Sequence, residues 1–330
     1  MTQLFKDRLV IANATGCSSI YGASSPVTPY SIPWASSLFE DNAEYGYGMK
    51  VADNIIKERI KKIIKDNIDL VGTDYDVYYN YLNDLNVENA QELYDIVDDG
   101  PLEELKPFKE FIMPRTYFLV GGDGWAYDIG YSGIDHVLST NENVNILVLD
   151  TELYSNTGGQ VSKSSRKGSI SEFAYSGKKT NKKDLAKMAL AYPNAYVASI
   201  NLGANPMHAL KILKEAESYK GVSIIIAYAP CIAHKIIEGM KSINEEKKAT
   251  KSGYFPLFHY NPEEQRFYLD SKADFDLYYE FLLGEDRYKK IKILNEEEAD
   301  ILLEQNKQNA IDRYKYLEDL NYSTQEKNNI

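Results

Sequence analysis

The chain lacks the features that mark secreted, membrane-spanning and nucleic-acid-binding proteins. Only two cysteines, Cys17 and Cys231, occur in 330 residues, which excludes a disulfide-dense scaffold and is typical of a reducing compartment. No apolar run has the length of a transmembrane helix, and the N-terminus has charges inside its first eight residues and no apolar signal-peptide core. A net charge of −12 argues against a nucleic-acid partner, because phosphate neutralisation requires Lys and Arg. We therefore expect a cytoplasmic protein without membrane or nucleic-acid contacts.

From residue 116 onward the sequence alternates short apolar strands with helices. The expected strands are 117–120, 144–149, 195–200 and 222–228, and the expected helices are 125–140, 183–191 and one that begins at Asn205-Pro206. Apolar strands that alternate with helices are typical of a parallel sheet buried on both faces. The predicted fold class is therefore α/β, a three-layer α/β/α arrangement around a mostly parallel sheet.

The remaining segments suggest how this sheet is extended and covered. We expect an α/β domain over residues 1–270, with a helical insertion at 69–110, and a C-terminal cover and helical tail over 271–330. Within these limits the sequence predicts a strand at 8–15, a helix at 34–68, an irregular cover at 253–292, a helix at 300–320 and disorder at 322–330.

The most specific local feature is Gly121-Gly122-Asp123-Gly124-Trp125, which follows an apolar strand. A second polar loop, Thr-Glu-Leu-Tyr-Ser-Asn-Thr-Gly-Gly-Gln at 151–160, follows the next strand. Glycine lets the backbone approach a phosphate closely, and its N–H groups can form an anion nest. A carboxylate in such a nest would repel a phosphate unless a divalent cation lay between them, and Mg²⁺ prefers carboxylates together with phosphate oxygens. The pattern indicates a metal-bridged diphosphate site.

Two other interpretations of the glycine turn are weaker. In a dinucleotide-binding fingerprint the third glycine would fall on Tyr127, and Asp123 has the wrong charge for a bare pyrophosphate. An ordinary strand–turn–helix link would account for the first loop but not for the second. Both loops and Cys231 follow strands, and ligands of open α/β sheets bind at the carboxyl ends of strands.

Three long segments resemble the thiamine-diphosphate-binding region of the pyruvate:ferredoxin (flavodoxin) oxidoreductase family. They are IANATGCSSIYGASSPVTPYSIPWASSLFEDNAEYGYGM, GGDGWAYDIGYSGIDHVLSTNENVNILVLDTELYSNTGGQVSKS and IIIAYAPCIAH. The resemblance covers most of residues 1–270 and corresponds to the C-terminal, cofactor-diphosphate-binding portion of a much longer polypeptide. The segment SRKGSI at 165–170 departs from the family's usual composition, which leaves the detail of that loop open.

The resemblance implies a role for each residue of the two loops. The diphosphate would be lined by Gly122, Asp123, Gly124 and Trp125. Mg²⁺ would be held by Asp123, Thr151 and the backbone carbonyl of Leu153. The same end of the cofactor would be wrapped by Thr151, Glu152, Leu153, Tyr154, Ser155 and Asn156, and Asn156 would approach the 2-oxo acid as a catalytic residue.

The resemblance also implies an iron–sulfur cluster near thiamine. Cys17 and Cys231 would supply two of the four thiolates of a [4Fe–4S] cluster, and Cys17 would also touch the cofactor. The family's Cys-x-x-Cys pair lies upstream of the segment that matches 2–5. We therefore expect this chain by itself to hold no intact cluster, because such a cluster requires four thiolates.

The function implied is oxidative decarboxylation of pyruvate to acetyl-CoA, with electrons passed through iron–sulfur clusters to ferredoxin or flavodoxin. The expected partners are pyruvate, coenzyme A, the electron carrier and the remainder of a longer, homodimeric polypeptide. Thiamine diphosphate and Mg²⁺ would bind this portion, and we expect the isolated chain to be inactive.

Three alternatives remain open at this stage. The chain could be the β subunit of a multi-subunit 2-oxoacid:ferredoxin oxidoreductase, although the absent Cys-x-x-Cys argues against that. It could belong to the related fusion enzyme that passes electrons to NADP through a flavin domain. It could also be a non-catalytic fragment that serves only assembly. The four histidines are expected to be surface or structural residues, His234 being the least secure because it neighbours Cys231.

Overall fold

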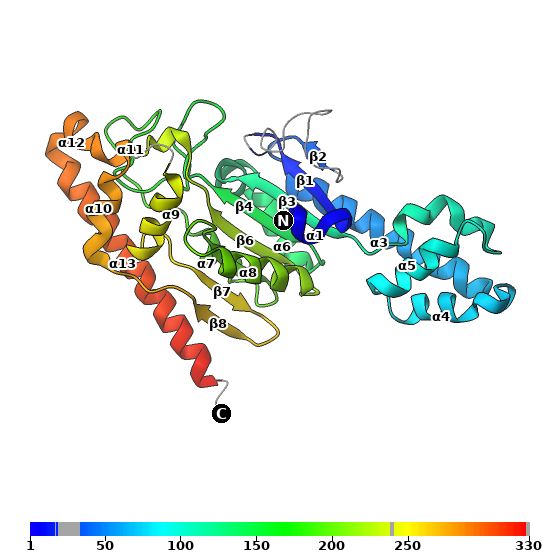
Figure 1. The fold of residues 1–330 in the computed structure, drawn as a ribbon. Helices are drawn as coiled ribbons and strands as arrows, with labels where there is room; N and C mark the ends of the chain where they lie inside the picture. Colours follow the sequence, from blue (N-terminus) through cyan, green and yellow to red (C-terminus); the bar gives the residue numbers. More distant parts are fainter. Residues whose placement is uncertain (17, 19–33, 238–240, 328–330) are drawn as a thin grey trace.

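A single eight-stranded sheet organises the chain (Figure 1). The computed structural model describes all residues except 17, 19–33, 238–240 and 328–330, so Cys17 lies outside the described residues. In sequence order the strands are β1 (Leu9–Ala14), β2 (Trp34–Ser37), β3 (Thr116–Gly122), β4 (Asn145–Asp150), β5 (Tyr196–Ile200), β6 (Ser223–Tyr228), β7 (Phe258–Asn261) and β8 (Arg266–Leu269).

The sheet is mostly parallel, as predicted. Its spatial order is β2-β1-β3-β4-β6-β5-β7-β8. The six strands from β2 to β5 in this order run parallel, and β7 and β8 add an antiparallel edge. The carboxyl ends of β1, β3, β4 and β6 therefore meet at one edge of the sheet.

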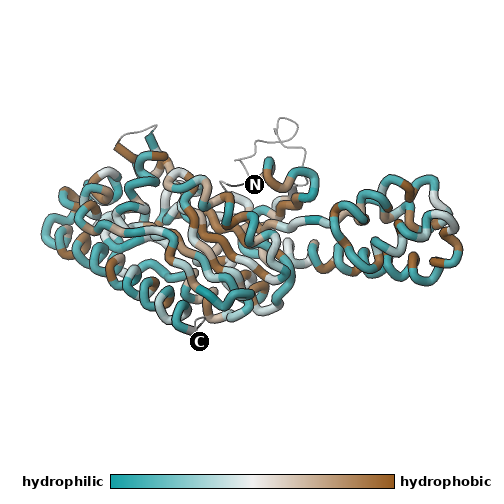
Figure 2. The backbone as a smooth tube through the Cα atoms, turned by 60° about the horizontal axis from the view of Figure 1, so that its bottom comes forward, coloured by the Kyte–Doolittle hydropathy of each residue, from teal (hydrophilic) through white to brown (hydrophobic). Residues whose placement is uncertain are grey.

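Alternating side chains of the strands point to opposite faces of the sheet and pack into two separate cores. The fold therefore has three layers, with helices on both faces of the sheet. On one face Val10 and Ala12 pack with α3 (Asn42–Asp66) and α6 (Tyr131–Thr140). On the other face Leu9 and Ile11 pack beneath α8 (Pro206–Ser218). Figure 2 shows the strands as the hydrophobic centre of the molecule. The first core also receives residues of α7 (Leu185–Ala189), α9 (Ser242–Lys251), α10 (Tyr278–Leu283), α11 (Asp286–Lys289), α12 (Ile291–Leu294) and α13 (Glu296–Lys327).

The helix α8 begins as the sequence predicts. The side chain of Asn205 accepts a hydrogen bond from the backbone N–H of His208 at 3.0 Å, and Pro206 occupies the first turn. An Asn cap satisfies an otherwise unpaired N–H, and proline loses nothing at a position whose N–H has no helical partner.

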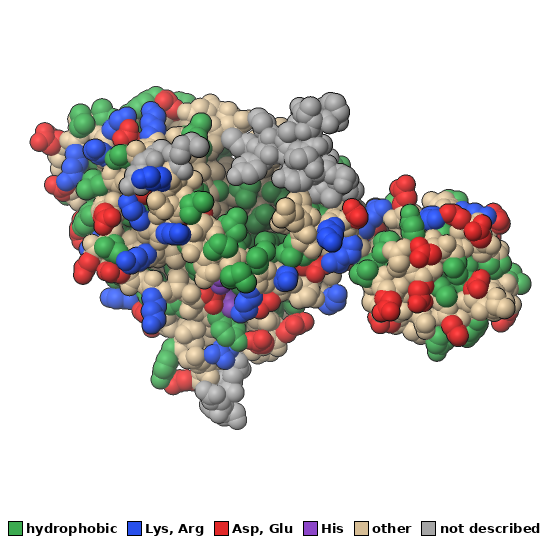
Figure 3. Space-filling model, viewed as in Figure 1, with side chains coloured by type: hydrophobic (Ala, Val, Ile, Leu, Met, Phe, Trp, Pro, Cys, Tyr) green, Lys and Arg blue, Asp and Glu red, His purple; other side chains and the backbone are tan. Residues whose placement is uncertain are grey.

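Residues 60–112 build a second, helical body beside the sheet, with a core of its own. The second half of α3 contributes Ile60, Ile63 and Ile64, and these pack with buried residues of α4 (Tyr75–Asn83), α5 (Val87–Ile96) and the 3₁₀ segment Glu103–Phe111. Figure 3 shows acidic side chains spread over this insertion, which projects away from the sheet. The proposed domain limits stay a prediction.

Three segments differ from the sequence-based expectations. Trp34–Ser37 is an edge strand paired with β1 and not the start of a helix. The hairpin β7–β8 replaces part of the expected irregular cover. The tail is helical to Lys327 because α13 lies along the sheet edge, where Thr324 and Asn321 accept hydrogen bonds from the N–H groups of Phe267 and Leu269. These contacts are non-local, so local composition does not reveal them.

No helix among the described residues has both the length and the apolar character that a bilayer crossing requires.

Two glycines of α3 give a matched test of how the helix packs on the sheet. A Cβ at Gly46 would lie 2.5 Å from Leu119 Cγ and 2.8 Å from Ala12 Cβ, whereas a Cβ at Gly48 would meet nothing within 4 Å. We expect Gly46→Ala to lower the free energy of unfolding by about 1–3 kcal/mol through overpacking. Gly48→Ala should raise it by up to about 1 kcal/mol through helix propensity. Urea unfolding of both variants checks this, and stabilisation by Gly46→Ala would contradict the packing described.

Candidate functional site

The three oxygen ligands expected for a metal ion converge at the ends of two neighbouring strands. Asp123 follows β3, Thr151 follows β4, and the strands pair through Gly122 and Leu149. Thr151 Oγ1 lies 2.7 Å from Asp123 Oδ1 and 3.0 Å from the carbonyl oxygen of Leu153. Adjacent oxygens of an octahedral Mg²⁺ shell with bonds of 2.0–2.1 Å are about 2.9 Å apart. Thr151 Oγ1 therefore lies at about the spacing of adjacent magnesium ligands from each of the other two oxygens.

A left-handed residue shapes the second loop. Glu152 has a φ of 60°, a conformation that is strained for a residue with a long side chain. The turn that results brings the Leu153 carbonyl back beside the Thr151 hydroxyl, and the Ser155 hydroxyl donates to Thr151 Oγ1 at 2.9 Å. Asn156 lies exposed at the tip of the same turn. The structure thus places Thr151, Leu153 and Ser155 together, with Asn156 at the solvent side.

Asp123 is a buried carboxylate that forms no ion pair with the described residues. Its two oxygens accept hydrogen bonds from the hydroxyls of Thr151 at 2.7 Å and Ser162 at 2.6 Å, and in the described part of the chain no basic side chain forms an ion pair with it. Burial, and after it the charge of Asp150, raises the pKa of Asp123 to about 7. A divalent cation beside the carboxylate would reverse that effect.

The glycines of the first loop serve different purposes. The position of a Cβ on Gly122 is open, with only the carbonyl oxygen of Leu149 at 3.9 Å, so the backbone there is approachable. A Cβ on Gly124 would lie 2.4 Å from the ring of Tyr154, so this glycine lets the second loop pack over the first. Trp125 is fully buried in the core, which leaves only its backbone for contact with a ligand.

The loop continues into a π-helix over Gly124–Ile129 before α6 starts. The expected α-helix therefore begins later than predicted. Short π-helical turns are rare overall, and those that occur are often found at functional sites. This wider turn lies directly after Asp123.

The side chain of Glu152 holds the second loop in a buried ion network. Its carboxylate contacts Arg166 at 2.8 Å, Arg287 at 2.9 Å and Lys182 at 3.1 Å, and the Tyr254 hydroxyl donates to it. Burial alone would raise the pKa of Glu152, but Lys182, Arg166 and Arg287 hold it well below the usual range. Because the carboxylate is used by the protein, any contact of Glu152 with a cofactor has to come from its backbone.

Charge pairing in the surrounding network leaves Asp123 as the exception. Asp150 pairs with Lys182 and accepts a hydrogen bond from the Tyr127 hydroxyl at 2.9 Å, and Glu285 pairs with Arg287 at 2.6 Å. Among the described residues, the other buried carboxylates of this edge thus have basic partners.

The turn that carries Cys231 is tied to the second loop through His234. This histidine is fully buried, and its Nε2 lies 2.6 Å from the carbonyl oxygen of Thr151; its Nδ1 lies 3.6 Å from Glu285. The Cys231 sulfur accepts a hydrogen bond from the N–H of Ala233 at 3.4 Å. The described residues contribute one thiol here, so they do not by themselves form the set of four that a [4Fe–4S] cluster requires.

Several residues of the site were not foreseen from the sequence. Ser162 bonds Asp123, Arg166 and Arg287 clamp Glu152, and Glu285 contacts His234. Arg166 belongs to the segment that departs from the family composition, and Arg287 is 135 positions away from Glu152. A contact across such a separation leaves no local pattern. The one available signal was a run of polar residues after the second loop.

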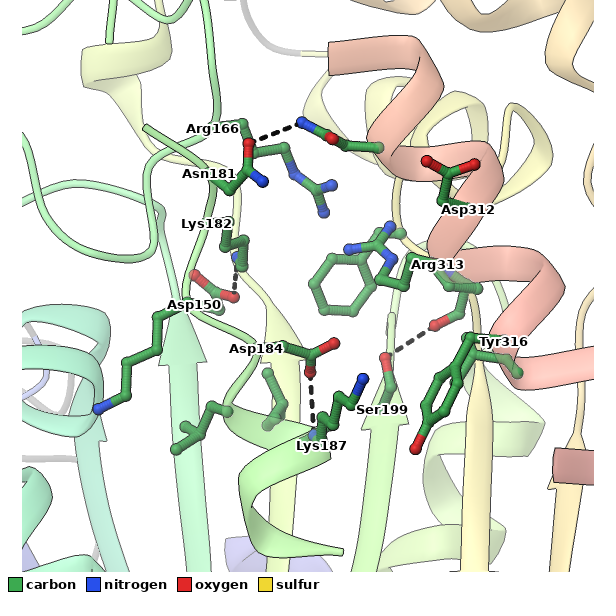
Figure 4. Close-up of a pocket in the computed structure, with 18 of the residues that line it drawn as sticks. Asp150, Arg166, Asn181, Lys182, Asp184, Lys187, Ser199, Asp312, Arg313 and Tyr316 are labelled. Carbon is green, nitrogen blue, oxygen red and sulfur yellow. Dashed lines mark hydrogen bonds and ion pairs between the residues drawn. The ribbon is translucent and has the colours of Figure 1, made fainter. Parts of the chain in front are cut away.

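A cavity of about 210 Å³ lies beside this network, between α13 and residues 181–187 (Figure 4). Asp150, Arg166 and Lys182 line it, whereas Asp123 and Thr151 do not. The cavity is therefore distinct from the converging oxygens described above.

Replacement of Asp123 by asparagine should reveal the cost of the unpaired charge. The folded-state pKa of about 7 lies above the ordinary value of 3.8, so the stability that Asp123 contributes is full below pH 3.8 and is lost as the pH rises through 7. In EDTA, the free energy of unfolding of Asp123→Asn should rise relative to that of the wild type by roughly 3 kcal/mol between pH 5 and pH 8. Urea unfolding at several pH values measures this, with the exposed Asp69→Asn as control. A difference independent of pH would refute the assignment.

Removal of the charge on Glu152 should destabilise the fold. In Glu152→Gln the buried Arg166 and Arg287 lose a carboxylate, and breaking a buried pair costs about 3–5 kcal/mol. Glu298, whose pair with Lys179 is exposed, gives the matched control, for which Glu298→Gln should change stability by under about 1 kcal/mol. Thermal and urea unfolding compare the two variants, and equal effects would show that the network does not hold the loop.

Comparison with known proteins identifies relatives of this site. Residues 111–227 match the family described as thiamine pyrophosphate enzyme, C-terminal TPP binding domain. The chain is 43% identical to pyruvate:ferredoxin oxidoreductase of Moorella thermoacetica, covering 96% of this chain and 30% of that protein. It is 41% identical to pyruvate-flavodoxin oxidoreductase of Klebsiella pneumoniae, covering 95% and 29%.

Two further matches extend the comparison. Mitochondrial pyruvate dehydrogenase [NADP(+)] of Euglena gracilis is 40% identical, covering 95% of this chain and 19% of that protein. Among solved structures, 2-oxoglutarate:ferredoxin oxidoreductase from Magnetococcus marinus aligns with a TM-score of 0.45 at 17% identity, over 69% of this chain and 56% of that one.

The chain spans about three tenths of the length of the ferredoxin- and flavodoxin-linked relatives. Over that length the resemblance seen in the sequence is confirmed, and the matched domain contains both the Asp123 and the Thr151 loops. The chain contains a thiamine pyrophosphate enzyme C-terminal domain, and over most of its length it is homologous to one portion of pyruvate:ferredoxin and pyruvate-flavodoxin oxidoreductases.

Proposed function

We propose that this chain binds thiamine diphosphate through Mg²⁺ at Asp123, Thr151 Oγ1 and the carbonyl of Leu153. The observation that carries the proposal is the meeting of these oxygens, 2.7 and 3.0 Å apart, at a buried carboxylate that has no basic partner among the described residues. Three protein oxygens leave room in an octahedral shell for phosphate oxygens and water.

The surrounding residues would position the cofactor. The open backbone at Gly122 offers close approach to a phosphate, and Asn156, exposed at the turn tip, would be available to a 2-oxo acid. Bound thiamine diphosphate supplies the electron sink for decarboxylation of a 2-oxo acid. In this proposal Asp123, Thr151 and Leu153 anchor the diphosphate and transfer no proton.

The whole protein would oxidise pyruvate to acetyl-CoA, with coenzyme A as acyl acceptor and ferredoxin or flavodoxin as electron acceptor. Relatives named for ferredoxin, flavodoxin and NADP(+) are 43%, 41% and 40% identical to this chain, so this segment does not select the acceptor. Cys231, together with Cys17, would ligate a [4Fe–4S] cluster when two further thiolates are present. A homodimer in the cytoplasm completes the proposal.

Calorimetric titration with thiamine diphosphate tests the site. The wild-type chain should bind the cofactor with Mg²⁺ and lose most of that affinity in EDTA, because the phosphates would then face Asp123 directly. Asp123→Ala and Thr151→Val should abolish the metal-dependent part, while Asp69→Ala, an exposed carboxylate of the insertion, should leave it unchanged. Metal-independent binding that survives Asp123→Ala would overturn the proposal.

A further inference from the structure

The cavity between α13 and residues 181–187 contains a partly buried guanidinium, that of Arg313, which forms no ion pair with the described residues. Arg313 extends from α13 into the cavity, facing the side of Arg166 (Figure 4). One terminal nitrogen of Arg313 donates to the carbonyl oxygens of Tyr254 and Gly253, and its Nε is buried without a hydrogen-bond partner. No carboxylate of the described residues forms an ion pair with it.

Arg166 places a second positive charge beside Arg313, and the carboxylates of Asp184 and Glu152 offset it only in part. Arg166 donates to the same Tyr254 carbonyl at 2.8 Å, so two guanidinium groups share one backbone acceptor. Burial and the charge of Arg166 lower the pKa of Arg313 to about 10, which still leaves it charged at neutral pH. A buried polar group without a partner calls for a ligand or an ion that supplies one.

The other charged groups of the cavity have partners elsewhere or lie at its mouth. Lys182 is paired with Asp150 and Glu152. Asp184 caps α7 by accepting from the N–H of Lys187 at 2.9 Å. At the exposed mouth, the Lys187 ammonium lies over the ring of Tyr316 at 4.4 Å, and Asp312 accepts from Gln308. Arg313 is therefore the guanidinium of the cavity that pairs with no carboxylate of the described residues, and Lys187 adds a positive charge at the mouth.

The rest of the wall is apolar. Ile226, Phe255, Phe258 and Leu317 line the cavity together with Leu185 and Ala186 of α7. A ligand that uses both parts of the wall needs one anionic group and a short apolar body. The volume of about 210 Å³ suits a molecule of a few carbon atoms.

We propose that this cavity binds a small aliphatic carboxylate, with its anionic group at Arg313 and its hydrocarbon body against Phe255, Ile226 and Leu317. The site is separate from the metal site, since Asp123 and Thr151 do not line it, and it does not depend on the proposed cofactor. Two cations of its wall, Arg166 and Lys182, also hold Glu152 and Asp150.

Isobutyrate and its neutral isostere isobutyramide provide a matched pair of probes for the 330-residue chain. We expect saturable binding of isobutyrate, measured by ligand-observed NMR at low salt without Mg²⁺ or thiamine diphosphate, and binding of isobutyramide at least tenfold weaker. Arg313→Met should abolish the preference for the acid. The exposed Lys211→Met on α8 removes a positive charge elsewhere and should leave binding unchanged.

A second variant keeps the test decisive if Arg313→Met does not fold. Ala186→Leu retains every charge and fills the cavity from α7, so it should block isobutyrate while circular dichroism shows a native fold. Equal binding of the two probes, undiminished isobutyrate binding in Arg313→Met or Ala186→Leu, or no saturable binding to the wild type would each overturn the proposal. Failure here would leave thiamine diphosphate binding at Asp123 unaffected.

Discussion

The site depends on one carboxylate that folding removes from water without a basic partner among the described residues. Desolvation of an unpaired carboxylate is costly, and at Asp123 the described structure offsets it only with the hydroxyls of Thr151 and Ser162. The neighbouring carboxylates Asp150 and Glu152 are neutralised by Lys182, Arg166 and Arg287. Among the described residues, this selective pairing leaves Asp123 as the carboxylate at which the proposed cation would bind.

The scaffold makes the charge usable by fixing the two loops relative to each other. Parallel neighbours β3 and β4 end at the same edge, so a short turn after each suffices to bring Asp123 and Thr151 together. The strained turn at Glu152 is stabilised from the far end of the sequence by Arg287, and His234 supports the carbonyl of Thr151. His234, from the turn after β6, and Arg287, from α11, thus stabilise a loop that belongs to neither element.

The part of this arrangement that is local in sequence could be predicted. A pattern within a few residues marks the apolar strands, the Asn205 cap and the Gly-Asp-Gly turn. From these patterns the parallel sheet and the proximity of Asp123 to Thr151 could be predicted. The strand Trp34–Ser37, the hairpin β7–β8 and the clamp by Arg287 depend on partners far away in the chain. Burial of Glu152 and His234 could not be inferred, because the segments that cover them had no recognisable pattern.

The helix α3 spans two bodies that otherwise fold around separate cores. At its start the Asn42 side chain donates to the carbonyl oxygens of Ala12 and Val120, at the ends of β1 and β3, and near its other end Ile60 and Ile64 lie in the core of the insertion. A helix of 25 residues is a stiff rod about 37 Å long. A partner that binds the insertion and tilts it would therefore move Asn42 through this helix, and with Asn42 the strand end that carries Asp123.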